Sequence, residues 1–289
     1  LGDRPTAVAR ALVTARSGII GLVTTTSAHF VPSSMLVARE VAARESGLFT
    51  SVVALDRFGA DDVASAFDHF SSLAAEAIVV IAPVDSLAEA VASQGASVPV
   101  VAVSGGRTFG RGVSVVHADQ RGGARALAEH LMTLGHRDIA CVAGPQEWFE
   151  ARERVAGWRE AMDEAGLSKR EPLVGSWEAR WGYVAGQNLV EDGLPDAVMC
   201  ANDEVAVGLL RAFAEARVSV PGDVSVAGFD DVPMAAYAGP GLTTVRQDFA
   251  DLGRCALEAV SRALDGEAVD TFVRPTRLVV RGSTGVCPR

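Results

Sequence analysis

Short runs of consecutive apolar residues alternate along the chain with longer segments in which apolar residues recur at helical spacing. The apolar runs predict strands at 19–24, 49–54, 77–81, 99–103, 114–117, 138–143, 197–201 and 224–228. The segments between them predict helices at 32–46, 61–75, 86–94, 120–134, 152–165, 179–191 and 202–216. Because the strands are apolar throughout, we expect helices on both faces of each sheet.

Regular alternation of strands and helices predicts right-handed crossover units, and hence an α/β fold with doubly wound parallel sheets. The number of strands favours two sheets over one. The 289 residues are enough for two lobes of ~130 residues each.

The composition is typical of a folded, acidic protein. Apolar residues make up 49% of the chain and the formal net charge is −10, so neither disorder nor general nucleic-acid binding is expected. Residues 4–16 are the exception, because they include three arginines and no acid. The longest aliphatic run, residues 77–84, is far shorter than the ~20 residues of a membrane span. The four cysteines show no zinc or disulfide spacing, which indicates reduced thiols in the cytoplasm.

Polar and aromatic residues follow four of the predicted strands. They are Thr25, Thr26, His29, Phe30, Gln146, Trp148, Asn202, Asp203, Asp230 and Asp231. Ligands of parallel sheets bind beyond the carboxyl ends of the strands, so these loops predict one binding crevice.

Two features near this crevice each allow two interpretations. Arg152 and Arg154 are two positions apart in a predicted helix, so one is expected to reach the crevice and the other solvent or an acid. Asn202 or Asp203 is expected to cap the next helix, and a cap is compatible with a ligand contact.

A pair of tryptophans and a pair of aspartates also have to be interpreted. Trp177 and Trp181 are four residues apart, and they either pack in the core or offer a face to a sugar ring or a base. Asp230 and Asp231 are neighbours and point apart, so a catalytic carboxylate pair is not expected. No histidine or third acid stands nearby, and no metal or cofactor is predicted.

Motifs of several enzyme classes are missing from the sequence. It contains no phosphate-binding GxxxxGK[ST] loop, no GxSxG nucleophile elbow and no HExxH zinc motif. We therefore do not expect an enzyme.

The first residues predict a short helix at 6–16, with Val8 and Leu12 on one face. An isolated helix of ~10 residues is marginal in water, so it is expected to form only when docked. It is either a frayed linker or a segment that folds on DNA, with Leu12 as an apolar wedge in the minor groove. The chain begins at Leu1 rather than Met and shows no signal peptide, so we expect a further segment upstream.

Several motifs together resemble the LacI/GalR family of bacterial transcriptional regulators. They occur in family order across essentially the whole chain, at residues 1–23, 134–140 (LGHRDIA), 143–145, 151–158 (ARERVAGW), 202–208 (NDEVAVG), 220–231 (VPGDVSVAGFDD) and 242–247 (LTTVRQ).

The resemblance implies a periplasmic-binding-protein-like core of type I, with two α/β lobes joined by three crossovers. Residues 1–17 would be the end of a helix-turn-helix headpiece and its hinge helix. Residues 18–117 plus 248–275 would form the N-terminal lobe, and residues 118–247 plus 276–289 the C-terminal lobe. It also implies a homodimer that binds operator DNA through the headpiece and hinge helix, and a small-molecule effector, a sugar, between the lobes.

Site residues follow from the same resemblance. The positions implied to bind the effector are Thr25, Phe30, Trp148, Arg152, Trp177, Asn202, Asp230 and Gln247, and those implied to contact DNA are Ala9 and Leu12. Lactose-type members have an acid after the strand that ends at Val103, where this chain has Ser104, so a galactoside is not implied.

Three other functions remain as alternatives. A transport protein that binds sugars has the same fold, but it requires a signal peptide or a lipidated cysteine. A regulator of the same family with a nucleobase or amino-acid effector is the second. A sugar hydrolase, the third, needs two converging carboxylates. Sugar-type residues favour release from DNA on binding over corepression.

Overall fold

The computed structural model describes residues 17–25, 48–56, 59–81, 84–94, 96–105, 112–268 and 270–288. The chain divides into two compact units, Leu1–His117 with Phe249–Arg274, and Ala118–Asp248 with Pro275–Arg289. The sequence analysis assigned Asp248 and Pro275 to the first lobe, whereas the structure assigns both to the second unit.

The first unit is built on a six-stranded sheet with the strand order β11-β5-β4-β3-β1-β2. Its strands are β1 (Ile19–Thr25), β2 (Phe49–Leu55), β3 (Ala77–Ile81), β4 (Val100–Val103), β5 (Val113–Ala118) and β11 (Thr271–Arg274). The pairs from β2 through β1, β3 and β4 to β5 are parallel.

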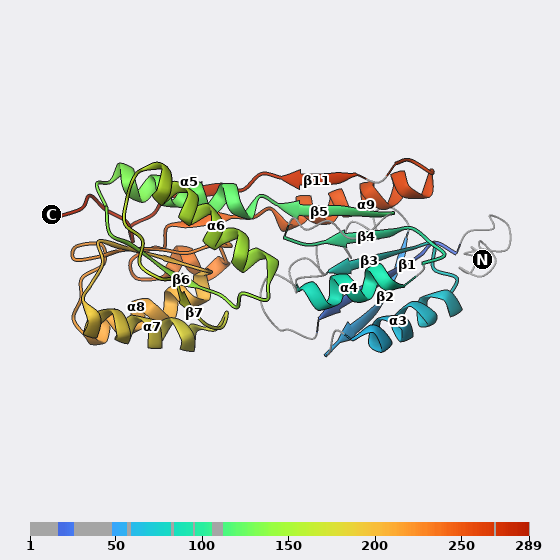
Figure 1. Cartoon of the computed structure of the whole chain (residues 1–289), viewed down its shortest axis with the longest axis horizontal. Coiled ribbons are helices and arrows are strands. Elements are labelled where there is room, and N and C mark those ends of the chain that lie inside the picture. The colour runs from blue at the N-terminus through green and yellow to red at the C-terminus, as the bar shows by residue number, and fades with distance from the viewer. Residues whose placement is uncertain are drawn as a thin grey trace, which may run out of the picture. The chain divides into compact units, whose positions relative to one another are not determined.

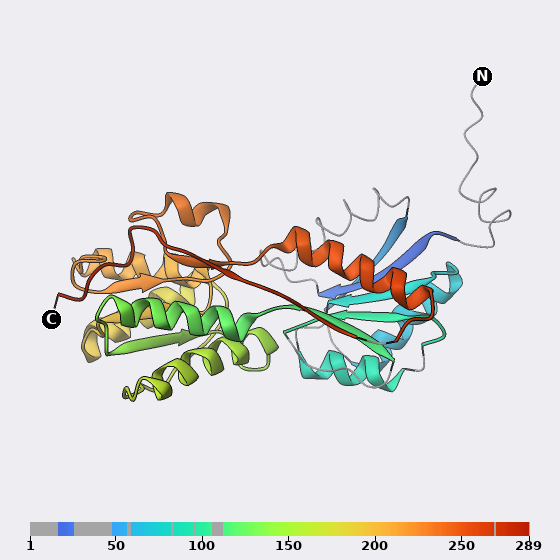
Figure 2. The same cartoon turned by 90° about the horizontal axis from the view of Figure 1, so that it is seen from above.

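Helices cover the sheet of the first unit on both faces. They are α3 (Ala60–Ser72), α4 (Asp85–Ser93) and α9 (Phe249–Leu264) (Figure 1). Figure 2 shows α9 on one side of this sheet and α4 on the other. Every residue of β3 is buried, as a strand covered on both faces requires.

The second unit is built on a parallel four-stranded sheet with the order β7-β6-β8-β9. Its strands are β6 (Ile139–Ala143), β7 (Leu173–Val174), β8 (Ala197–Cys200) and β9 (Ser225–Ala227), with β10 (Thr244–Arg246) and β12 (Arg277–Val279) as a separate antiparallel pair. Its helices are α5 (Gln120–Thr133), α6 (Phe149–Glu164), α7 (Ala179–Asp192), α8 (Asp203–Glu215) and the 3-10 helix η1 (Pro233–Tyr237). The predicted α/β fold with doubly wound parallel sheets is confirmed.

Alternate residues of β6 enter two separate cores. Cys141 packs with α5 and α6, in a cluster that includes the fully buried Trp158. Val142 packs with α7 and α8, in a cluster that includes Phe213. Successive side chains of a strand point to opposite faces, so an unbroken apolar run supplies both helix layers.

Several predicted bounds and elements differ from the structure. Helix α6 begins at Phe149, three residues before the predicted start. No element was predicted after residue 228, yet η1, β10, α9, β11 and β12 follow it. The helix predicted at 32–46 lies outside the described residues.

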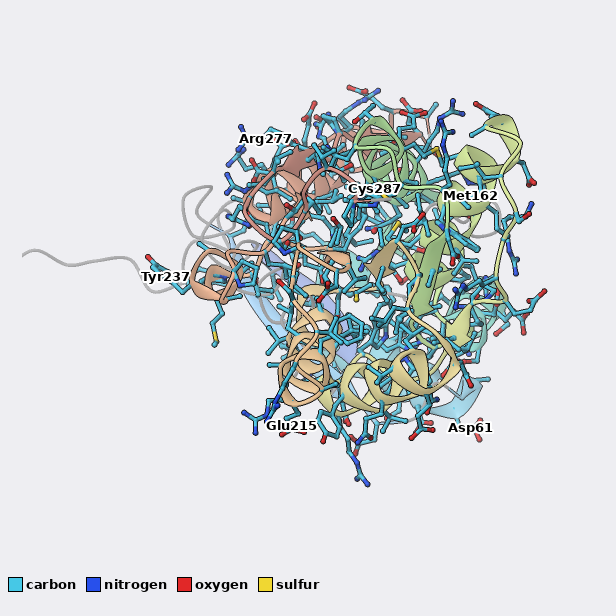
Figure 3. The ribbon with its side chains drawn as sticks, turned by 90° about the vertical axis from the view of Figure 1, so that its left-hand side faces the viewer. Asp61, Met162, Glu215, Tyr237, Arg277 and Cys287 are labelled. Carbon is cyan, nitrogen blue, oxygen red and sulfur yellow. The ribbon has the colours of Figure 1, made fainter. Side chains whose placement is uncertain are left out.

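Two exposed side chains mark the surface of the second unit in Figure 3. Glu215 stands at the end of α8, and Tyr237 projects from η1. Tyr237 is 88% exposed.

Candidate functional site

The carboxyl ends of β6, β8 and β9 lie together at one edge of the sheet of the second unit. The parallel register pairs Val142 with Cys200, and Met199 with Ala227. The loops that follow these strands therefore meet, as the sequence analysis expected, and α6 begins directly after the first of them.

Arg154 of α6 lies at the centre of this region, and each nitrogen of its guanidinium donates a hydrogen bond. Its Nη2 donates to Asp230 Oδ1 at 2.9 Å and its Nε to Gln120 Oε1 at 2.9 Å. Its Nη1 donates to the carbonyl oxygen of Ala201. The side chains of Arg154 and Asp230 are only 4% and 5% exposed. Burial of two charges is tolerated where both are paired and hydrogen-bonded, as they are here.

Gln247 closes a ring of hydrogen bonds around this ion pair. Its Nε2 donates to Asp230 Oδ1 at 2.7 Å, and its Oε1 accepts from Gln120 Nε2 at 2.8 Å. The four side chains of Gln120, Arg154, Asp230 and Gln247 thus fix one another, and we call them the polar ring.

Aromatic side chains lie against the polar ring. The Arg154 Cζ atom is 3.9 Å from the ring centroid of Phe229 and 5.5 Å from that of Trp177. Trp148 meets Trp177 edge to face, with centroids 5.7 Å apart and planes at 77°. A Cβ atom on Gly144 would lie 2.7 Å from Trp177 Cζ3, so only glycine permits this approach.

Asn202 both caps α8 and holds the backbone of Trp177. Its Oδ1 accepts from the amide of Val205 at 2.8 Å, and its Nδ2 donates to the Trp177 carbonyl at 3.1 Å. Of the two candidate caps, Asn202 is therefore the cap.

Asp230 and Asp231 point to different partners, as expected for neighbours in sequence. Asp231 forms ion pairs with Arg246 and with Arg281, the latter at 2.6 Å. Both aspartates have positive φ angles, 102° and 52°, which are uncommon for residues other than glycine. This backbone turns one carboxylate into the polar ring and the other away from it.

Asp203 also fixes the loop that carries Asp230 and Asp231. Its Oδ2 accepts from the amide of Val232 at 2.8 Å, and its Oδ1 from the hydroxyl of Thr244 at 2.6 Å. Burial, reinforced by the charge of Asp230, raises the pKa of Asp203 to about 8.

Glu150, in the first turn of α6, is a second acid of this region with a raised pKa. Burial raises the pKa of its carboxyl to about 7, against the opposing effects of a hydrogen bond from its own backbone amide and of the charge of Arg154. Its Oε2 atom is buried and has no hydrogen-bond partner among the described residues.

The structure brings five of the predicted site residues together: Trp148, Trp177, Asn202, Asp230 and Gln247. It places Arg154, rather than Arg152, in the polar ring. Arg152 donates to the carbonyl of Gln146 at 2.9 Å and lies 5.0 Å from the ring centroid of Phe149.

Four predicted residues cannot be placed in this site. Thr25 ends β1 in the first unit, and its side chain is not described. Phe30, Ala9 and Leu12 lie outside the described residues, so their roles stay predictions.

The sequence analysis missed Gln120 and the position of Arg154. The signal for Arg154 was its helical phase, because Ala151, Val155 and Trp158 are buried on the same face of α6. Arg152 falls outside this phase.

The described part of the chain holds neither a metal site nor a membrane-spanning helix. No group of three or more His, Cys, Asp or Glu residues there is arranged to hold a metal ion. Within the same ranges, no helix has the length and the apolar character that a membrane crossing requires.

Comparison with known proteins identifies the family. The periplasmic binding protein-like domain family matches residues 128–284. The transcriptional repressor PurR of Glaesserella parasuis is 31% identical over 264 residues, which cover 90% of this chain and 77% of that protein.

Solved structures agree with this match. A crystal structure of the Lac repressor dimer bound to operator and the anti-inducer ONPF has a TM-score of 0.87 at 29% identity, over 98% of this chain and 100% of that chain. The complex of the transcriptional regulator CelR with cellobiose has a TM-score of 0.82 at 27% identity, over 93% of this chain and 85% of that chain. The chain belongs to the LacI/GalR family of transcriptional regulators and corresponds to their core region.

Proposed function

We propose that this chain is the effector-binding core of a transcriptional repressor, and that its effector is a sugar or a sugar derivative. The observation that carries this proposal is the buried polar ring beside Trp148 and Trp177. A guanidinium and a carboxylate offer planar sets of donors and acceptors that suit vicinal hydroxyls. Indole faces suit the apolar face of a sugar ring. The similarity to the regulator solved with cellobiose supports the same class of ligand.

Within the site, we assign hydroxyl binding to Arg154, Asp230, Asn202 and Gln247. Arg154 takes the role that the family resemblance gave to Arg152, because it is Arg154 that forms the ion pair with Asp230. Trp148 and Trp177 form the aromatic wall. Thr25 and Phe30 are proposed as contacts from the first unit.

DNA binding is proposed through the hinge residues Ala9 and Leu12 and a helix-turn-helix headpiece. The effector is proposed to release operator DNA, by a change in the relation between the lobes. A cytoplasmic location follows from this role. The similarity to a repressor bound to operator supports the proposal.

A homodimer is proposed as the working assembly. The similar Lac repressor structure is a dimer, and η1 exposes 69% of Met234 and 88% of Tyr237. Light scattering is expected to give twice the chain mass, and the double variant Met234→Ser/Tyr237→Ser is expected to shift the protein toward monomer.

Calorimetric titration with mono- and disaccharides, including cellobiose, tests the sugar proposal. Arg154→Lys keeps the charge but removes the planar donor set, so the affinity for a sugar that binds is expected to fall by ~10-fold or more. Arg152→Lys is the matched control two positions away, and its affinity is expected to stay within about twofold. Binding of a nucleobase or an amino acid in place of every sugar would contradict the proposal.

A further inference from the structure

Two buried polar atoms of the site have no hydrogen-bond partner in the part of the chain that the structure describes: Glu150 Oε2 and Trp177 Nε1. One is an acceptor and the other a donor. Buried polar atoms in native proteins are nearly always paired, and an exception at a binding site indicates where a ligand completes the pairing.

Glu150 lies on the same face of α6 as Arg154, one helical turn before it. Residues four apart on a helix are neighbours, and the Glu150 carboxyl is close enough to Arg154 and Asp230 for both charges to act on it. Glu150 therefore lies near Arg154 and Asp230 of the polar ring.

The arginines around Glu150 are engaged with other groups. The three guanidinium nitrogens of Arg154 donate hydrogen bonds to Gln120, Ala201 and Asp230. Arg152 acts on Glu150 more weakly than Arg154, and it donates to the carbonyl of Gln146. The carboxyl of Glu150 is thus left with an acceptor atom for a donor from outside the protein.

We propose that Glu150 is a specificity-determining contact of the effector site, which accepts a hydrogen bond from a hydroxyl or ammonium group of the effector and excludes anionic sugars. This inference rests on the proposed function and narrows its ligand class to neutral and amino sugars. Above the pKa of Glu150, sugar phosphates and uronic acids are excluded, because their charge would lie beside two carboxylates, of which Arg154 pairs only Asp230. A hydroxyl near Trp177 Nε1 can likewise accept a hydrogen bond from the indole N–H.

The test compares sugars that share one ring and differ in charge. Wild-type protein, Glu150→Gln and the exposed neighbour variant Glu147→Gln are titrated at about pH 7.5, above the pKa of Glu150. The ligands are glucose, glucosamine, glucuronic acid and glucose 6-phosphate, the corresponding galactose series, and cellobiose. Gln has the size of Glu without its charge, so Glu150→Gln tests charge rather than packing.

The expected result is that wild-type protein binds a neutral or amino sugar at least ten times more tightly than the matching anionic sugar. Glu150→Gln is expected to reduce this ratio at least fivefold, with the largest loss for the amino sugar, while Glu147→Gln leaves the ratio unchanged. An anionic sugar as the tightest ligand, or an unchanged ratio in Glu150→Gln, overturns the inference and leaves the sugar proposal standing. Absence of binding for every sugar overturns the proposed function, and the inference with it.

Discussion

Arg154 and Asp230 form an ion pair of 2.9 Å whose side chains are 4% and 5% exposed. The two residues are 76 positions apart in sequence, and they come from α6 and from the loop after β9. A buried ion pair adds little to stability compared with apolar residues of similar size, because both charges lose their hydration. Its presence at the carboxyl edge of the sheet is therefore better explained by ligand binding than by folding.

Loss of one partner of this pair is expected to be strongly destabilising. Arg154→Met leaves Asp230 as an unpaired buried carboxylate, for which a loss of about 3–5 kcal/mol is expected. Urea unfolding followed by circular dichroism measures the loss. The double variant Arg154→Met/Asp230→Asn removes the second charge and keeps a residue type that tolerates the positive φ of position 230. It is expected to recover most of the loss, and a double variant as unstable as the single one would contradict this account.

The two hydrogen bonds of Asn202 can be separated by substitution. Asn202→Ala removes the helix cap, whereas Asn202→Ser keeps a capping oxygen, so Asn202→Ala is expected to lose about 1 kcal/mol more than Asn202→Ser. Both variants remove the amide that donates to the Trp177 carbonyl, and both share the cost of that lost hydrogen bond. We therefore expect both to change tryptophan fluorescence, and Asn202→Ala to lower the free energy of unfolding further. Equal losses of stability would show that capping is not the stabilising contact.

Much of the fold could be predicted because each strand of the parallel sheets is a short, unbroken apolar run. Strand β3, predicted at residues 77–81, has those bounds in the structure. Because the strand is buried on both faces, all its residues are apolar, and the apolar run marks where the strand begins and ends. Helix α9 shows the opposite outcome. Its buried residues Leu252, Cys255, Ala256, Ala259 and Val260 follow helical spacing, so this helix could have been predicted from its apolar face but was not.

The site was predictable where a residue lies directly after a strand. Asn202 and Asp230 hold such positions, and the topology brings them together. Gln120 was not predictable in this way, because it reaches the polar ring from the first turn of α5. Its contact with Gln247 joins residues 127 positions apart, which local patterns do not encode.

Substitution at Gly144 is expected to disturb the aromatic wall. A Cβ atom there would lie 2.7 Å from Trp177 Cζ3 and 2.8 Å from Cη2, so Gly144→Ala must displace the indole. We expect a loss of about 1–3 kcal/mol and a shifted tryptophan emission maximum.

Gly241 provides the control for this substitution. A Cβ atom on Gly241 meets its nearest neighbours at 3.5 Å, which is ordinary van der Waals contact. Gly241→Ala is therefore expected to leave the emission of Trp177 unchanged. The same emission shift in both variants would argue against the close approach at Gly144.

The stability of the protein is expected to depend on pH through two acids, Asp203 and Glu150. Burial raises the pKa of Asp203 from 3.8 to about 8 and that of Glu150 from 4.5 to about 7. Above its pKa in the unfolded chain, each carboxyl loses its proton in the unfolded chain but keeps it in the folded protein. The contribution of each carboxyl to stability therefore falls as the pH rises, and it levels off above the pKa of the folded protein.

Variants that cannot ionise isolate this contribution from that of the other acids. Relative to wild type, Glu150→Gln is expected to become progressively more stable as the pH rises from 4.5 to about 7, and Asp203→Asn from 3.8 to about 8. Urea unfolding at a series of pH values gives the difference in free energy directly. A stability difference that does not change with pH would mean that the carboxyl ionises in the folded protein as it does in the unfolded chain, and that its burial is compensated by contacts with the charged form.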